Sequence, residues 1–405
     1  MAIYKYRAKK DPENIVEGKI EAFSEKEAIE KISSMGYLPV HLEKAGETSY
    51  TQTGSSGKSS LRVRSREITV ASRQLSSLLK SGVPILNALN IIGEQSEDPN
   101  LKGVLGSIHD AVKEGSSFSQ ALEEYPAIFS PLYIALIRTG ENSGALADAL
   151  LRISDYRVKQ EEMFSRFRMA LAYPVLMAIV GCGTVVFMLA FVMPRLMRMY
   201  VNMEQKLPLP TQILISITEG LQKWWFWILL FVILASLVFI RQAKTKAGKL
   251  SLSLIKLHIP VFGEFILKAE LARFSRTLEL LIKSGIPILN AIDISIPVLD
   301  NEIVRIQLKK SYKELEQGGS LGRSLKSSKL FPLFMSNLII VGEESGKLDD
   351  ALKEVANSYE KDTDEAIRVM GSLLEPVMIL VMGLIVGFIV IAMLLPIFGI
   401  NMMVK

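Results

Sequence analysis

The chain has 405 residues, of which 49% are hydrophobic, and its formal net charge is only +5. Long apolar stretches joined to sizeable polar domains account for this mixture, and so mild a charge does not point to nucleic acid as a partner. The single cysteine, Cys182, lies in an apolar stretch, which excludes a disulfide framework and a cysteine-based zinc site. His41, His109 and His258 lie in three separate segments without metal-ligand spacing, so we expect neither a metal nor another cofactor.

Residues 1–44 are predicted to form a small α+β module. Apolar and polar residues alternate over 3–8, as in a half-buried strand, and further strands are predicted at 15–23 and 37–42 around a short helix. A module of this size favours docking over catalysis. Residues 45–65, rich in Gly, Ser and Thr, are predicted to be a flexible linker. Its Gly57-Lys58-Ser59 resembles a phosphate-binding loop, but the glycine that this loop needs five residues earlier is replaced by Gln52.

From residue 66 onward the chain repeats itself at an offset of 202 or 203 residues. The segment Lys80–Asn90 (KSGVPILNALN) returns as Lys283–Asp293 (KSGIPILNAID), and Gly140–Leu146 (GENSGAL) returns as Gly342–Leu348 (GEESGKL). Each copy is a polar, helix-patterned half followed by an apolar stretch, which indicates duplication of a whole module. We therefore predict helical bundles over 66–168 and 241–375.

Three stretches are candidates to cross a membrane: 169–194, 224–240 and 376–398. The first and last carry no charge and exceed the roughly 20 residues that a hydrocarbon core requires. The middle stretch is shorter, but its three tryptophans suit a membrane interface. A buried helix of a soluble domain remains its alternative. The middle stretch has no counterpart in the repeat. As a span, its role would be to return the chain across the membrane, so that both bundles lie on the same side of it.

Basic residues predict the orientation of these spans. Arg157, Lys159, Arg166 and Arg168 precede the first span, and basic residues also follow the second from Arg241 onward. The positive-inside rule then places both bundles in the cytoplasm and the loop 195–223 in the periplasm. The predicted fold is mainly α: a polytopic membrane protein with two tandem cytoplasmic helical bundles, three transmembrane helices and the N-terminal α+β module.

The repeated motifs have two interpretations. In the structural one, the repeated glycine of Ser-Gly-x-Pro ends a helix and the proline starts the next. In the functional one, Glu141 and Glu343 lie on exposed turns that a cytoplasmic partner recognises. Gly383 and Gly387 form a small-xxx-small face that favours helix contact and a homo-oligomer. The candidate structural or partner-contact residues are Gly82, Pro84, Gly140, Glu141, Gly144, Pro174, Gly285, Pro287, Gly342, Glu343, Gly346, Pro376, Gly383 and Gly387.

The sequence holds no recognised catalytic motif, so we predict that the protein is not an enzyme. A transporter subunit is a further alternative. The absence of ionisable residues at mid-depth in the spans argues against it, because pathways for ions and polar solutes usually contain such residues.

Taken together, these motifs resemble the type II secretion system F family. The resemblance covers nearly the whole chain, through the N-terminal module, both repeated motifs, Tyr173-Pro174, Glu375-Pro376 and the closing segment 394–398. It implies a non-enzymatic, multi-pass scaffold of the bacterial inner membrane. Its expected partners are a cytoplasmic assembly ATPase, pseudopilins or pilins, other inner-membrane platform components and the lipid bilayer. The segments 207–211 and 394–398 favour the secretion branch, and type IV pilus assembly is the alternative.

Overall fold

The computed structural model describes residues 2–9, 15–22, 25–34, 38–45, 63–195, 208–260 and 262–401. Most of the predicted linker, its phosphate-loop-like segment and the first half of the predicted periplasmic loop lie outside the described residues. The chain divides into two units, Met1–Leu61 and Arg62–Lys405. It is mainly helical, as the sequence predicts.

The N-terminal unit contains a three-stranded sheet in the order β2-β1-β3. Its elements are β1 (Ala2–Lys9), β2 (Ile15–Ala22), α1 (Glu25–Ser34) and β3 (Leu38–Ala45). Both strand pairs are antiparallel, with Tyr4 opposite Ile20 and Tyr6 opposite Leu42. The register between β1 and β3 shifts where Ala8 faces Pro39. Proline lacks an N–H for the ladder and is tolerated at an edge strand or an irregularity.

The second unit contains the repeat, and its helices correspond one to one. The first copy comprises α2 (Ser65–Lys80), α3 (Ile85–Gln95), α4 (Pro99–Lys113), α5 (Phe118–Glu123), α6 (Pro131–Asn142) and α7 (Leu146–Phe187). The second comprises α11 (Phe262–Lys283), α12 (Ile288–Ser295), α13 (Glu302–Glu316), α14 (Leu321–Ser327), α15 (Leu333–Ser345) and α16 (Leu348–Asn401). The 3₁₀ turn η3 (Ile296–Val298) extends α12.

Equivalent positions cap equivalent helices and fill equivalent cores. Asp98 caps α4 and Asn301 caps α13. The side chain of each accepts hydrogen bonding from the backbone N–H of the first helical turn. The buried apolar residues also repeat at the sequence offset, which explains why two copies with diverged surfaces keep one packing pattern. The pairs are Leu75 and Leu278, Leu89 and Ile292, Ile137 and Ile339, and Leu150 and Leu352.

The last helix of each copy continues from the bundle into the apolar stretch. Helix α7 has 42 residues and α16 has 54, so neither is interrupted at the predicted boundary between bundle and span. Pro174 and Pro376 lie inside these helices. Helical structure also continues past Pro194 and Pro396, and reaches Arg195 and Asn401. A π turn, η2 (Met188–Val192), lies directly ahead of Pro194, where the proline ring would meet an α-helical carbonyl.

Helix α9 (Leu209–Lys244) includes the predicted middle span, and α10 (Lys246–His258) follows it. The prediction of a loop through residue 223 is therefore wrong from Leu209 onward. Among the described residues, the helices Leu146–Arg195 and Leu348–Leu395 are long and apolar enough to cross a membrane. A third span would be counted if α10 and α11, bent by 113°, formed one. However, α11 buries Glu270 and Glu279 in the second bundle, which does not suit contact with lipid.

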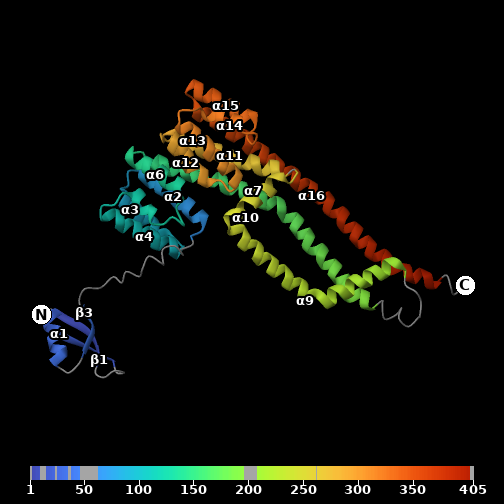
Figure 1. Cartoon of the computed structure of the whole chain (residues 1–405), viewed down its shortest axis with the longest axis horizontal. Helices are drawn as coiled ribbons and strands as arrows, with labels where there is room; N and C mark the ends of the chain where they lie inside the picture. Colours follow the sequence, from blue (N-terminus) through green and yellow to red (C-terminus); the bar gives the residue numbers. More distant parts are fainter. Residues whose placement is uncertain are drawn as a thin grey trace. The chain divides into compact units, whose positions relative to one another are not determined.

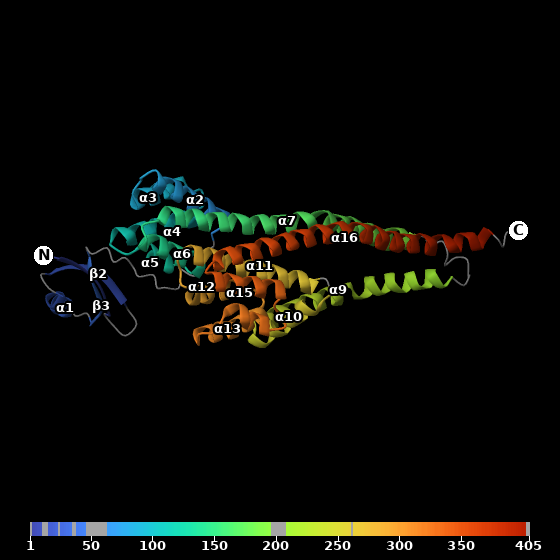
Figure 2. The same cartoon turned by 90° about the horizontal axis from the view of Figure 1, so that it is seen from above.

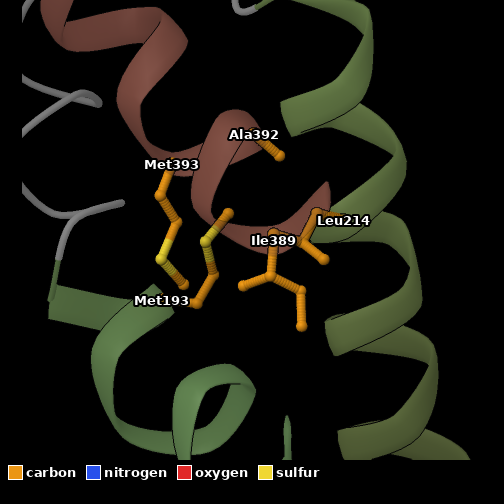
Figure 3. Close-up of a cluster of buried hydrophobic side chains, with 5 residues drawn as sticks. All are labelled: Met193, Leu214, Ile389, Ala392 and Met393. Carbon is orange, nitrogen blue, oxygen red and sulfur yellow. The ribbon is translucent and has the colours of Figure 1, made fainter. Parts of the chain in front are cut away.

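Helices α7, α9 and α16 extend away from the bundles (Figure 1), and in a view turned by 90° α7 and α16 run side by side (Figure 2). Far from the bundles, all three meet in a small apolar cluster (Figure 3). It consists of Met193, Leu214, Ile389, Ala392 and Met393. The Thr211 hydroxyl adds a hydrogen bond of 2.5 Å to the carbonyl of Ala392, which ties the first turn of α9 to α16.

Candidate functional site

The two Ser-Gly-x-Pro turns join consecutive helices in the same way. Gly82 follows α2 with φ +83°, and Gly285 follows α11 with φ +86°. This left-handed conformation, which suits glycine, lets the backbone close the end of the preceding helix: Val83 N–H donates to the Leu78 carbonyl at 3.1 Å. Pro84 and Pro287 are the N-cap residues of α3 and α12. Both turns have the geometry that the structural interpretation of this motif expects.

The glutamates of the Gly-Glu-x-Ser-Gly motif bind the N-termini of neighbouring helices. Glu141, in the last turn of α6, accepts hydrogen bonds from Phe118 N–H at 2.6 Å and from both the N–H and the hydroxyl of Ser119, at 3.1 and 2.7 Å. Because backbone N–H groups at a helix start lack partners and carry partial positive charge, a carboxylate placed there caps the short helix α5.

The second copy repeats this arrangement. Glu343, in α15, accepts hydrogen bonds from Leu321 N–H at 2.8 Å, from Gly322 N–H at 3.1 Å and from the Ser320 hydroxyl at 2.5 Å. Both glutamates are half-buried and lie within helices. The functional interpretation, that they lie on exposed turns, is therefore wrong, because both carboxylates are occupied inside the protein by a helix about 20 residues earlier in the chain.

The other glycines of this motif allow a tight turn and a close helix approach. Gly144 and Gly346 adopt φ +72° and +70°. A Cβ at Gly140 would lie 2.5 Å from Ala149 Cβ, and one at Gly342 would lie 2.6 Å from Ala351 Cβ. The bulk of any other side chain would push α6 away from α7, or α15 away from α16. The motif is thus a joint that holds three helices of each bundle together.

Residues that the sequence analysis did not identify as contacts connect the two repeats. Tyr156 of α7 lies 3.0 Å, oxygen to oxygen, from the Thr277 hydroxyl of α11. Arg152 donates to the Lys283 carbonyl at 3.0 Å, and the Arg166 guanidinium pairs with the Asp364 carboxylate of α16. These partners are 121 to 198 residues apart in the sequence. Side-chain spacing within α7 gives no signal for contacts of this kind.

A cavity of about 200 Å³ lies among α7, α11 and α16, beside these contacts. Its lining includes Tyr156, Phe164, Arg166 and Arg276. The Arg276 guanidinium donates to both Glu360 oxygens, at 2.8 and 2.7 Å. These hydrogen bonds, opposed by burial, raise the pKa of Arg276. The pKa of Tyr156 is raised as well, but in this case the main cause is burial. The charges of Arg166 and Arg276 on this lining are thus paired with carboxylates within the protein.

The glycines and prolines of the apolar helices differ in their surroundings. Gly181, in α7, lies against Met382 of α16, and Gly371 of α16 lies against Ala170 of α7, so small residues let these helices approach closely. Pro174 is buried, whereas Pro376 is exposed. A Cβ at Gly383 or Gly387 would meet nothing within 4 Å. The predicted contact at that face concerns another molecule and stays a prediction.

The described residues contain no group of three or more His, Cys, Asp or Glu side chains that could hold a metal ion. The structure has two similar bundles, which contact each other through the hydrogen bonds and the ion pair described above. Each bundle is continuous with a long apolar helix. Residues 71–194 and 274–396 both match the family model of type II secretion system protein F, and residues 1–43 match that of its N-terminal domain. The chain belongs to the type II secretion system protein F family.

Relatives that match nearly the whole chain are named after two systems, type IV pilus assembly and type II secretion. The chain is 32% identical to the type IV pilus assembly protein PilC of Thermus thermophilus, over 99% of this chain and 98% of that protein. It is 31% identical to PilC of Myxococcus xanthus, over 94% and 91%. It is 30% identical to the type II secretion system protein F of Vibrio cholerae, over 99% of both.

The two stretches matched by the protein F family cover most of the two structural repeats. The first runs from within α2 to just beyond η2, and the second from within α11 to near the end of α16. Helices α9 and α10 lie between them and belong to neither stretch. The joints at Glu141 and Glu343 lie inside the stretches, at corresponding positions.

Proposed function

We propose that this protein is an inner-membrane platform of a bacterial type II secretion system, which couples a cytoplasmic assembly ATPase to the assembly of pseudopilins. The observation that carries the proposal is the pair of family-matched repeats, in which each bundle continues without interruption into a long apolar helix. Such a helix connects events at a bundle to the membrane. No catalytic role is proposed for the protein itself.

The alternative is a platform of type IV pilus assembly, which would bind pilins instead. It is favoured by the relatives named PilC, whose identities of 31–32% match those of the secretion relatives, at 30–32%. Sequence identity alone does not separate the two systems. Other inner-membrane platform components are expected partners in either machine.

The proposed topology has three spans, formed by α7, α9 and α16, with both bundles in the cytoplasm. Its support is the uncharged stretch from Trp224 to Ile240 within α9, together with the basic residues that flank the spans on the bundle side. Alkaline phosphatase fused after Leu209 is expected to be active, and fused after Asp300 it is expected to be inactive. The reverse pattern would overturn the orientation.

A homo-oligomer in the membrane is a further part of the proposal. It is supported by Gly383, which is exposed on α16 with open space where a Cβ would stand. Replacing Gly383 with leucine is expected to weaken association between copies in nanodiscs. Leu384→Ala, at an exposed neighbour on another face of the helix, is the control.

The test of function is deletion of the gene, complemented with the wild-type gene or with the conservative surface variant Gly106→Ala. Secreted proteins and surface pili are scored in parallel. Loss of secretion with intact pili supports the secretion platform, provided that both complementing genes restore it. Loss of pili with intact secretion would establish the pilus platform, and loss of neither would overturn both.

A further inference from the structure

Helix α10 has an apolar face that the described part of the protein leaves partly uncovered. Leu250, Leu254 and Ile255 on this face are 37%, 44% and 58% exposed. The exposed apolar surface continues beyond the helix through Ile259 to Phe262. Exposed apolar residues on one side of a helix indicate that something else covers that side.

The opposite side of α10 is fixed to the second bundle. Ser253 is buried, and its hydroxyl accepts a hydrogen bond from Glu302 N–H at 3.1 Å. Its carbonyl accepts one from the Asn301 side chain at 3.4 Å. These contacts, at the start of α13, determine which way α10 faces. The fold therefore determines which residues of α10 lie on its outward side.

The charge of this region identifies what covers the face. Between residues 241 and 263 the sequence has one arginine, four lysines and no acidic residue. Of these, Lys249 and Lys256 are exposed on α10, seven residues apart and therefore on one polar side of the helix, away from its apolar face. A helix with an apolar face, a lysine-bearing polar side and no acids is typical of segments that lie in the interface of an anionic bilayer.

The position of α10 in the chain brings it to such a surface. It begins two residues after the end of α9, the proposed middle span, and turns away from it at Thr245. Phe262, the first residue of α11, lines an apolar groove of about 300 Å³ among α7, α11 and α16, beside Phe167 and Leu374. The exposed apolar surface of α10 thus continues onto the membrane-facing helices.

We propose that α10 lies in the headgroup region of the cytoplasmic leaflet, with Leu250, Leu254 and Ile255 at the acyl boundary and Lys249 and Lys256 on anionic lipid phosphates. Because α10 also holds the start of α13, the lipid surface would help to orient the second bundle. The offset of the repeat pairs α10 with the predicted linker, most of which lies outside the described residues, so no counterpart of α10 is among the described helices of the first bundle. The inference rests on the proposed orientation, and does not depend on which machine the platform serves.

The test uses the full chain in nanodiscs containing equal amounts of phosphatidylglycerol and phosphatidylcholine. Cys182 is replaced by serine, and a fluorophore is attached to a single cysteine introduced by Ile255→Cys. Brominated acyl chains, which quench the fluorophore on contact, are placed on only one of the two lipids at a time. We expect both lipids to quench, and brominated phosphatidylglycerol to quench at least about twofold more.

Two label positions serve as controls. A fluorophore at Ile179→Cys, on the exposed apolar part of α7, should be quenched equally by both lipids. One at Ser107→Cys, exposed on α4, should not be quenched. The double variant Lys249→Gln, Lys256→Gln should bring the quenching ratio at position 255 close to one. Lys102→Gln with Lys113→Gln, exposed on α4 of the first bundle, should leave it unchanged.

Three results would overturn the inference. An unquenched fluorophore at position 255 would place the face in water. Equal quenching by the two lipids would remove the preference for anionic lipid. Disulfide cross-linking of Ile255→Cys between copies, together with loss of quenching, would show that a second chain covers the face. A deletion strain that keeps both secretion and pili would contradict the proposed function but would not affect this quenching result.

Discussion

The hydroxyl of Tyr156 lies 3.0 Å from the hydroxyl of Thr277, and this contact joins the long helix of the first repeat to the first helix of the second. Both side chains are buried, and the Gln160 amide donates to the same tyrosine oxygen at 2.8 Å. The two bundles therefore share a polar contact at their common boundary. Buried polar groups of this kind are costly to leave without partners.

Tyr156→Phe is expected to destabilise the protein by about 1–2 kcal/mol, because the Thr277 hydroxyl and the Gln160 amide lose a partner in a buried place. The measurement is the thermal unfolding midpoint in detergent. Tyr312→Phe, at a half-buried position on α13, provides the comparison. Equal midpoints for the two variants would show that the contact contributes nothing to stability.

Glu343→Ala should loosen the start of α14, because three hydrogen bonds to one carboxylate disappear together. We expect a loss of about 1–3 kcal/mol and faster amide hydrogen exchange at Leu321 and Gly322. Mass-spectrometric exchange of the α14 peptide measures the effect. Glu344→Ala changes the adjacent residue, whose ion pair with Arg323 of α14 is exposed and therefore weak, and should affect that peptide far less.

Gly140→Ala is expected to destabilise the first bundle, by about 1–3 kcal/mol, because the new methyl group would overlap Ala149 and the start of α7. Gly106→Ala is the matched substitution in open space on α4. It should stabilise by up to about 1 kcal/mol, since alanine is the better helix former. Unfolding midpoints that move in the same direction would contradict the close approach of α6 and α7.

Glu270 predicts a pH dependence with a definite sign. Burial raises the pKa of Glu270 above its ordinary value of 4.5, although Arg273 and the N–H of Asp300 act against this. The folded protein therefore holds this proton more tightly than the unfolded chain. The stabilising contribution of protonated Glu270 is complete below pH 4.5 and is lost as the pH rises through the raised pKa.

Glu270→Gln removes this titration. We expect the unfolding midpoint of the variant, relative to wild type, to rise as the pH increases through this window, and to be constant well above it. Thermal unfolding between about pH 4 and pH 7 measures the difference. A midpoint difference that falls with rising pH would mean that Arg273 outweighs burial at this site.

The sequence predicted what depends on neighbours along the chain. The Gly82 and Pro84 turn was predictable, because a positive φ and a fixed proline φ are properties of those residues themselves. The positions of α7 and α16 followed from periodicity and from long apolar stretches. The repeat also predicted that the second bundle has the same series of helices as the first.

The sequence did not predict contacts made through space. Glu141 was assigned to an exposed turn because the motif reads as polar and glycine-rich, but its partners Phe118 and Ser119 lie on a different helix. The one available signal was that Ser117 and Ser320, which cap α5 and α14, recur at the offset of the repeat. The predicted boundary between bundle and span at residue 168 rests on a change in polarity along the sequence. The backbone hydrogen bonds of α7 do not depend on that change, so the helix continues across it.

The uninterrupted α16 has a mechanical consequence. At about 1.5 Å per residue, its 54 residues span about 80 Å, so a tilt of about 5° at the bundle end would carry the far end sideways by about 7 Å. Because α7 lies against it and both reach the cluster around Met193 and Ala392, such a displacement would be shared by the ends of all three long helices. A small angular movement at the bundle end would thus become a displacement of several ångströms at the far end of these helices.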